Sequence, residues 1–190
     1  MFSKRMADNS PGSTDPSADW MLQLKNGQES AFDRIVERWQ SPLLNFFNRS
    51  LRSYEQSEDL TQMVFIRLYR AAPSYEARAR FSTFLFQIAR RLLINEYRRN
   101  QRKPLDAWDP ADFQSFSAES TSRRYAEIEE AFEEVLHKLP ENQRTAILLL
   151  KQQELSYQEI AEVMEASESA VKTWIFRARQ FLKQELKDLV

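Results

Sequence analysis

A concentration of basic side chains between residues 80 and 103 is the feature of this sequence best suited to bind another molecule. The segment holds seven lysines and arginines against one acidic residue, Glu96, although the whole chain has a formal net charge of −1. Segment 104–134 reverses the balance, with nine acidic and two basic residues, and segment 166–187 returns to five basic and two acidic residues. Because grouped cationic side chains attract phosphates, the pattern predicts two nucleic-acid surfaces separated by an acidic spacer. Solvated helix faces are the alternative interpretation.

Helical spacing arranges the first basic segment into two stripes. The region from about 82 to 102 is predicted to be one long helix with an apolar side made by Phe84, Leu85, Ile88, Ala89 and Leu92. Its opposite side is polar along its length and carries Gln87, Arg91, Asn95, Arg98 and Arg102. This polar stripe is the first candidate surface.

The second basic segment follows a helix-turn-helix pattern. Ser156 and Glu159 form a capping box that opens a short helix, 157–164, and Ser167 caps a second helix after a tight turn at Glu165 and Ala166. A left-handed residue in that turn costs on the order of 1 kcal/mol, since no glycine is present. The inner face of the second helix holds Val171, Ile175, Ala178 and Leu182, and Trp174 is expected to pack on the preceding helices. The outward side chains, which can reach base edges or phosphates, are Glu168, Ser169, Lys172, Thr173, Phe176 and Arg177. An ordinary helical hairpin is the alternative.

Composition indicates the elements that position these surfaces. With two glycines and abundant helix formers, the chain is expected to be all-α, with two small helical domains joined by a flexible linker and a helix-turn-helix in the second. Cysteine is absent and His137 is the only histidine, so we expect no disulfide, metal or other cofactor. No apolar run is long enough to span a membrane and no signal peptide is evident, so we expect a cytoplasmic protein without membrane insertion. The expected boundaries are a disordered tail, 1–17, a first domain, 18–103, a linker, 104–122, and a second domain, 123–190.

The first domain is expected to contain several helices before the long one. A helix over 19–26 would be closed by Gly27, and the next would be capped by Ser30 and restarted at Ser41 and Pro42. Ser57 is expected to open a helix that runs to about Ala72, where Pro73 stops it. In the second domain, helices are expected from about Arg123 and over 141–151.

Four segments, in this order and spacing, carry a resemblance to a known family. They read SAFDRIVERWQ, SEDLTQMVFIRLYRA, FSTFLFQIARRLLINEYRR and LPENQRTAILLLKQQELSYQEIAEVMEASESAVKTWIFRARQFL. Together they closely resemble the extracytoplasmic-function (ECF) group of bacterial RNA polymerase sigma factors, in the sigma-70 family. The first three resemble region 2 and the last resembles region 4. The resemblance implies promoter recognition and transcription initiation by a chain that is not an enzyme.

This resemblance also implies a role for each surface. Asp59, Gln62 and Ile66 would dock on the β′ clamp helices of the core polymerase, with the β flap as a further contact. The −10 element would be opened and its strand held by Tyr75, Phe81, Arg91, Asn95, Arg98 and Arg99. The −35 duplex would be bound by the outward residues of the helix-turn-helix. Asn95 stands where the family often has aspartate, and Trp174 where it often has arginine, so each DNA surface departs from the family pattern at one position.

Three other functions are alternatives to this one. A helix-turn-helix repressor or activator usually binds as a dimer, but the basic face of the first domain favours a sigma factor. An enzyme is disfavoured because the sequence shows no phosphate loop, thiol site or paired-histidine site. A pure interaction protein, such as an antagonist of another sigma factor, is the last alternative. An anti-sigma partner is expected to mask the linker and both DNA faces, since Trp108, Phe113 and Phe116 are apolar residues in an acidic setting.

Overall fold

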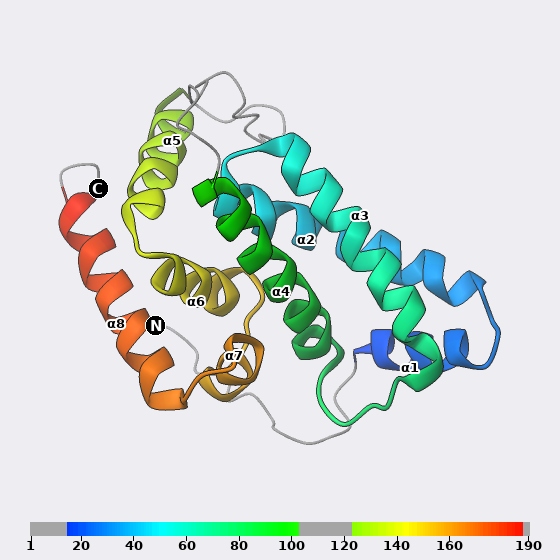
Figure 1. Cartoon of the computed structure of the whole chain (residues 1–190). Helices are drawn as coiled ribbons and strands as arrows, with labels where there is room; N and C mark the ends of the chain where they lie inside the picture. The colour runs from blue at the N-terminus through cyan, green and yellow to red at the C-terminus, as the bar shows by residue number, and fades with distance from the viewer. Residues whose placement is uncertain (1–14, 103–122, 188–190) are drawn as a thin grey trace, which may run out of the picture.

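The structure is a computed structural model, which describes residues 15–102 and 123–187 (Figure 1). Within these residues the chain is all-α, as predicted, and no described helix is long and apolar enough to cross a membrane. The predicted linker and nearly all of the predicted tail lie outside the described residues. The elements are α1 (Pro16–Lys25), α2 (Ser30–Leu51), α3 (Tyr54–Ala71), the 3-10 helix η1 (Ala72–Ser74), α4 (Phe81–Arg102), α5 (Arg123–Lys138), α6 (Glu141–Gln152), α7 (Tyr157–Met164) and α8 (Glu168–Glu185).

The first helix begins earlier than the sequence pattern indicated. Asp15 caps α1 by accepting a hydrogen bond from the Ser17 backbone N–H at 3.1 Å, and Pro16 occupies the first helical position, where its missing N–H costs nothing. Gly27 follows the helix with a φ of +86°, in the left-handed region where glycine is favoured, as predicted. Helix α1 therefore includes Pro16 and Ser17, which were expected in the tail.

Helix α2 is continuous, and the predicted restart at Pro42 is wrong. Proline removes one helical hydrogen bond and crowds the preceding turn, at a cost of roughly 3 kcal/mol. The buried side chains of α2 nevertheless keep one helical register across Pro42, from Ile35 through Trp39 and Leu43 to Phe46. Burial of a large apolar side chain contributes about 1.5–3 kcal/mol, so several such residues outweigh the proline.

Helix α3 also begins before its predicted cap. Ser53, not Ser57, caps the helix by accepting a hydrogen bond from the Gln56 N–H at 3.3 Å. Ser57 lies one turn inside the helix, buried, and donates its hydroxyl to the Ser53 carbonyl at 2.6 Å. Ser53 and Ser57 have equal capping propensity, and the helix begins after Ser53, which follows the end of α2.

A cluster of aromatic rings fills the centre of the amino-terminal half, which comprises α1–α4. The ring of Phe86 lies 5.3 Å from Phe46 and 6.2 Å from Trp39, both with edge-to-face geometry. Phe81 joins the cluster with its ring 5.8 Å from Trp39. These contacts tie α4 to α2 and fix the direction in which the polar side of α4 faces.

The carboxy-terminal half, α5–α8, contains the predicted helix-turn-helix in α7 and α8. Ser156 accepts a hydrogen bond from the Glu159 N–H at 3.2 Å, and the Glu159 carboxylate accepts one from the Ser156 N–H at 2.8 Å, so the capping box is confirmed. Ser167 caps α8 through the Ala170 N–H at 3.2 Å, also as predicted. Glu165 adopts the left-handed conformation, with φ 52° and ψ 46°, in the turn where glycine is missing.

Replacing Ser156 with alanine is expected to destabilise the carboxy-terminal half by about 1 kcal/mol, because the Glu159 N–H loses its acceptor. Denaturant unfolding followed by circular dichroism measures the loss. Gln158→Ala, an exposed change in the same helix, serves as the control and should stay within about 0.5 kcal/mol of the parent. Equal stability of parent and Ser156→Ala would show that the cap contributes nothing.

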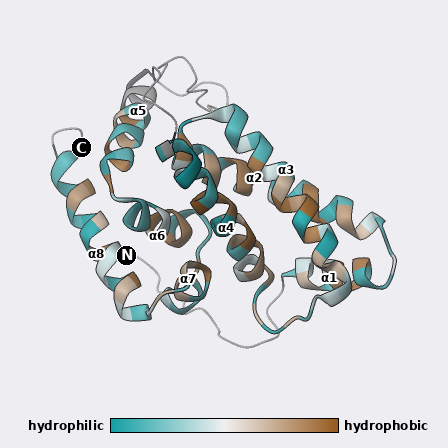
Figure 2. Cartoon of the chain, viewed as in Figure 1, coloured by the Kyte–Doolittle hydropathy of each residue, from teal (hydrophilic) through white to brown (hydrophobic). Residues whose placement is uncertain are grey.

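The two halves pack against each other around α4. In Figure 1, α4 lies in the middle of the molecule, between α2 and α3 on one side and α6 and α7 on the other, and its principal contact with the carboxy-terminal half is α7. Helix α2 also contacts α5 and α6. Buried apolar residues from both halves form one continuous cluster, and the apolar sides of the helices face inward in Figure 2. The described structure is therefore a closed arrangement of the two halves.

Candidate nucleic-acid interface

The outward face of α8 presents the six residues that the helix-turn-helix pattern singled out. All are exposed, and Phe176 is the most accessible large apolar side chain of the described residues, at 63%. Lys172 forms an ion pair with Glu168 at 2.7 Å, and Thr173 donates its hydroxyl to the Ser169 carbonyl at 3.0 Å. The face thus combines a cation, hydroxyls and an aromatic ring on one rigid helix.

The inner side of α8 holds this face in place. Val171, Ile175 and Ala178 are buried, at helical spacing, against the rest of the carboxy-terminal half. Trp174 is half-buried and packs against the apolar cluster, as predicted. Because one side of α8 is fixed in this way, the opposite side is directed to solvent.

The polar side of α4 is the second candidate surface. Arg91, Asn95, Arg98 and Arg99 are exposed along it. Arg99 forms an ion pair at 2.6 Å with Glu96, whose side chain is buried. The surface therefore remains cationic, with one of its arginines held in position by a carboxylate of the same helix.

Two residues expected in the −10 interface are buried instead. Tyr75 is 4% exposed and Phe81 is 1% exposed. The Tyr75 ring packs 5.2 Å from Phe84, and burial, with repulsion from Asp15 and Asp19, raises the pKa of its hydroxyl. Helical periodicity did not reveal this, because the helix was expected to begin only after Phe81 and the segment from Tyr75 to residue 80 is not helical. The prediction that their rings are free to stack on bases is wrong for the closed arrangement.

The loop before α4 offers arginines in place of those rings. Residues 76–80 are all exposed, and they include Arg78, which pairs with Glu76, and Arg80. Guanidinium groups can neutralise phosphates or stack on bases, so this exposed loop has side chains suited to a nucleic-acid strand. The excess of basic residues from position 80 onward indicated Arg80, but Arg78 was missed.

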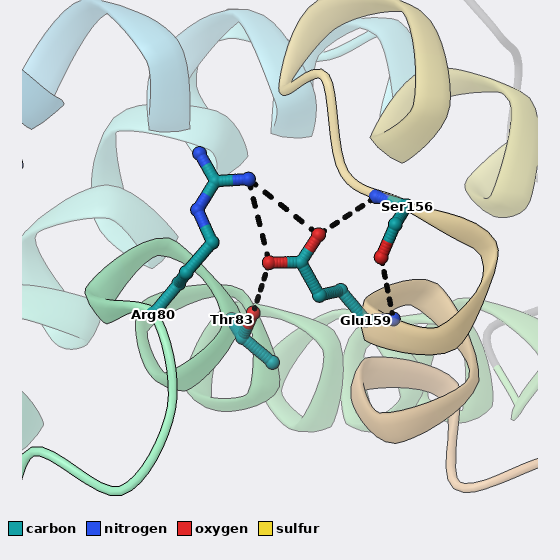
Figure 3. A network of polar contacts seen from close by, with 4 residues as sticks. All are labelled: Arg80, Thr83, Ser156 and Glu159. Atoms are coloured by element: carbon teal, nitrogen blue, oxygen red, sulfur yellow. Dashed lines mark hydrogen bonds and ion pairs between the residues drawn. The ribbon is translucent and has the colours of Figure 1, made fainter. Parts of the chain in front are cut away.

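A network of polar contacts joins this loop and α4 to the helix-turn-helix (Figure 3). The Glu159 carboxylate that caps α7 also lies 3.4 Å from the Arg80 guanidinium and accepts a 3.5 Å hydrogen bond from the Thr83 hydroxyl. Further along α4, Arg91 donates through Nε and Nη2 to Glu165 Oε1, at 3.2 and 2.9 Å. Two acidic residues of the helix-turn-helix thus pair with two arginines, one in the loop before α4 and one on the polar side of α4.

A buried charged pair joins α2 to α5. The Glu133 side chain is 2% exposed, and its carboxylate lies 3.0 Å from Arg49, which also pairs with Glu129. Burial raises the pKa of Glu133 to about 7, assisted by repulsion from Glu129 and opposed by attraction to Arg49 and Arg52. This carboxyl group therefore titrates near neutral pH in the closed arrangement.

His137 lies next to this pair, in contact with a buried arginine. Its Nδ1 is 2.9 Å from the Arg144 guanidinium, which also donates to the His137 carbonyl at 3.2 Å and to the Tyr97 hydroxyl at 3.4 Å. Burial, followed by repulsion from Arg144 and Arg52, lowers the pKa of His137 to about 3. The neutral ring can accept the arginine's hydrogen bond, so His137 has a structural role here.

The outer side of α3 forms a third exposed surface. Asp59, Gln62 and Ile66 lie on it at helical spacing, and all three are exposed. Met63 and Tyr69 extend the surface and are 41% and 45% exposed. Met63 was missed, although its position between Gln62 and Ile66 placed it on the same side. The surface therefore combines exposed apolar and polar side chains, as surfaces that bind another protein do.

Comparison with known proteins identifies both halves. The sigma-70 region 2 family matches residues 35–103, and the sigma-70 region 4 family matches residues 129–182. The chain is 30% identical to RNA polymerase sigma-H factor of Pseudomonas aeruginosa, over 88% of this chain and 92% of that protein. It is 32% identical to the ECF RNA polymerase sigma factor SigW of Bacillus subtilis, over 88% and 95% of the two chains.

Solved structures show the same arrangement of helices. CnrH, solved in complex with the cytosolic domain of CnrY, matches with a TM-score of 0.69 and 26% identity, over 92% of this chain and 99% of CnrH. The sigma factor RpoE of Bartonella quintana, solved with the anti-sigma factor NepR, matches in fold with a TM-score of 0.64 and 22% identity, over 82% and 96% of the two chains. With two relatives matched along nearly their whole length and both regions present in order, the chain belongs to the extracytoplasmic-function group of the sigma-70 family.

Proposed function

We propose that this promoter-recognising sigma factor divides its task between two helices, with α4 holding the melted −10 strand and α8 binding the −35 duplex. The observation that carries the proposal is the pair of exposed polar surfaces, one on each half of the chain. Helix α8 is the second helix of a helix-turn-helix, the element that enters the major groove. The arginines of α4 suit a single strand, whose phosphates they would neutralise. On this proposal, domain 18–103 acts at −10 and domain 123–190 at −35.

The outer side of α3 is proposed as the docking surface for core RNA polymerase. Asp59, Gln62 and Ile66 would contact the β′ clamp helices, with Met63 extending the apolar part of the contact. The carboxy-terminal half would contact the β flap. Exposed apolar side chains ringed by polar ones support a protein contact, since such residues gain by leaving water.

An anti-sigma factor is proposed as the regulatory partner. CnrH, whose fold this chain shares over almost its whole length, was solved with a second protein bound, which supports a similar partner here. The linker residues expected to take part lie outside the described residues. Sigma factors are non-enzymatic initiation factors, so we propose a cytoplasmic protein that acts by binding, without catalysis or a cofactor.

In vitro transcription with core polymerase and promoter fragments from the native genome tests the proposal. Asp59→Ala with Gln62→Ala is expected to weaken binding to core polymerase about thirtyfold, since interface polar contacts contribute on the order of 1 kcal/mol each, or about 2 kcal/mol together. Lys172→Ala with Arg177→Ala should leave core binding unchanged and weaken binding to the −35 duplex by about 1–3 kcal/mol.

Matched controls separate these effects from changes in the fold. Glu37→Ala, an exposed change on α2, should not affect core binding, and Gln184→Ala, near the far end of α8, should not affect duplex binding. If the unmodified protein directed no initiation and bound duplex DNA as a dimer, the proposal would be overturned in favour of an ordinary helix-turn-helix regulator.

A further inference from the structure

We propose that the acidic side of the helix-turn-helix is an internal docking surface for the −10 surface of α4, so that the closed chain inhibits its own strand binding. The inference rests on the proposed function, because it takes Arg91 as a strand-binding residue. Glu159 and Glu165 are the acidic residues concerned, and Arg80 and Arg91 are their partners. In the closed arrangement, carboxylates occupy guanidinium groups that would otherwise be available to phosphates.

The geometry of the Arg91 contact supports this competition. Both Nε and Nη2 of Arg91 donate to one oxygen of Glu165. An arginine also uses two donors when it binds a phosphate. An arginine engaged in this way cannot make the same bonds to a DNA strand. The second contact lies at the start of α4, where Glu159 faces both Arg80 and Thr83 (Figure 3). The two contacts therefore cover the amino-terminal part of the −10 surface.

These contacts are weak enough to be displaced. The side chains of Arg91 and Glu165 are 64% and 67% exposed. In the other pair Arg80 is 52% exposed and Glu159 is 17% exposed, and the two groups are 3.4 Å apart. Exposed ion pairs are weakened by salt and contribute little individually, so two of them bias an equilibrium about fivefold rather than locking it. A DNA strand, which offers many phosphates at once, can outcompete two carboxylates.

The interface between the halves contains buried polar groups without hydrogen-bond partners, which are uncommon in a permanently packed core. Arg90 Nε and Nη1 on α4 and Glu133 Oε2 and His137 Nε2 on α5 are buried without a hydrogen-bond partner among the described residues. Each such group opposes closure, because it gives up water without replacing it. Apolar contact holds the halves together while these groups oppose it, which is expected of an interface that opens in use.

The recognition surface of α8 stays exposed in the same arrangement. Among the described residues, none of its six residues forms a hydrogen bond or ion pair with the amino-terminal half, and Phe176 is open to solvent. Closure therefore restrains strand binding at −10 and leaves duplex binding at −35 available. The inhibition is selective for one of the two DNA surfaces.

Distance measurements on the full chain test whether these carboxylates keep it closed. Because the protein has no cysteine, Glu55→Cys on α3 and Lys183→Cys on α8 introduce one spin label in each half at exposed positions. Glu159→Gln with Glu165→Gln should shift the distance distribution to longer values, and glutamine at 159 keeps the helix cap. Salt should produce the same shift in the parent but little further change in the double variant.

Glu162→Gln is the control, since Glu162 is exposed on α7 and forms no ion pair among the described residues. It should leave the distances unchanged. Restoring the pair with reversed charges, Arg91→Glu with Glu165→Arg, should return the distribution toward the closed one seen in the parent. If the double glutamine variant kept the parent's distribution, the inference would be overturned.

Binding of a mixed-sequence single-stranded DNA tests the inhibition itself. The double glutamine variant should bind this probe about fivefold more tightly than the parent, because the two ion pairs that it loses favour the closed arrangement by about that factor. Longer distances without tighter binding would show that closure does not mask the surface, and would also overturn the inference. Failure of the proposed function gives a different result: Arg91→Ala would then bind the single strand as well as the parent.

Discussion

Replacing Phe86 with alanine should destabilise the protein by about 3–5 kcal/mol, because the change leaves a cavity among fully buried rings. Phe86 is in contact with Phe46 and Trp39, so its loss removes aromatic contacts that join α4 to α2. Small domains are stable by only about 5–15 kcal/mol, so this loss removes a large part of the free energy of unfolding of the amino-terminal half. Denaturant unfolding followed by circular dichroism and tryptophan fluorescence measures the effect.

Phe176→Ala is the matched control for this prediction. It removes the same ring from an exposed position and should change stability by no more than about 0.5 kcal/mol. If the two variants lost the same stability, the aromatic cluster around Phe86 would not be the main support of the amino-terminal half. A loss of −35 duplex binding in Phe176→Ala, with unchanged stability, would be consistent with its place on the recognition surface.

Replacing Arg49 with methionine should destabilise the closed protein by about 3 kcal/mol near pH 8, and much less near pH 5. The folded-state pKa of Glu133, about 7, lies above its ordinary value, so the folded state holds this proton more tightly than the unfolded state. The stabilising contribution of the protonated group is present at low pH and is lost as the pH rises through about 7. Without Arg49, an ionised Glu133 is buried with less positive charge beside it, which lowers the free energy of unfolding. This loss appears only at pH values at which Glu133 is ionised.

Unfolding of parent and variant at both pH values measures this difference. Glu133→Gln in the Arg49→Met background should remove the dependence, because no group is then left to ionise. Arg38→Met, which removes a more exposed arginine of α2 that lies 3.8 Å from Asp15, should cost less than about 1 kcal/mol at either pH. An equal loss at both pH values would mean that Arg49 acts through packing on Phe132, against which its guanidinium lies.

His137 gives the parent protein the opposite slope. Its folded-state pKa, about 3, lies below the ordinary value, so the folded state binds this proton less tightly and stability increases with pH from about 3 to about 6.5. Glu133 and His137 therefore offset each other over much of the acidic range. For this reason the Arg49 variant is compared with the parent at each pH, where the contribution of His137 largely cancels.

Local signals predicted the carboxy-terminal half of the fold well. The boundaries of α7 and the caps of α7 and α8 depend on short-range chemistry, and the capping box at Ser156 and the cap at Ser167 were identified from residue types and spacing alone. The outward face of α8 followed from the same periodicity. At Pro42 and Ser57, where local preference competes with packing, local reasoning was wrong, since buried residues on both sides of Pro42 hold α2 in one helix.

What the sequence could not supply were contacts between distant segments. Tyr75 is buried against Phe84 of α4, and Phe81 packs on Trp39 of α2. No helical pattern covers the loop between η1 and α4. The contacts of Glu159 and Glu165 with α4 join residues more than seventy positions apart. The sequence indicated where charges gather, but the pairing of basic α4 with acidic positions of the helix-turn-helix required the three-dimensional structure.

The capping box has a consequence for the rate of promoter association. The two oxygens of Glu159 have different partners. Oε2 accepts a hydrogen bond from the Ser156 N–H at 2.8 Å, and Oε1 accepts one from the Thr83 hydroxyl across the interface. Separation of the halves therefore leaves the cap of α7 intact, and the helix-turn-helix stays preorganised. A binding surface that is already ordered loses little conformational entropy when it meets its target. Duplex association by this unit should then be limited by diffusion and orientation rather than by folding, and should be equally fast before and after opening.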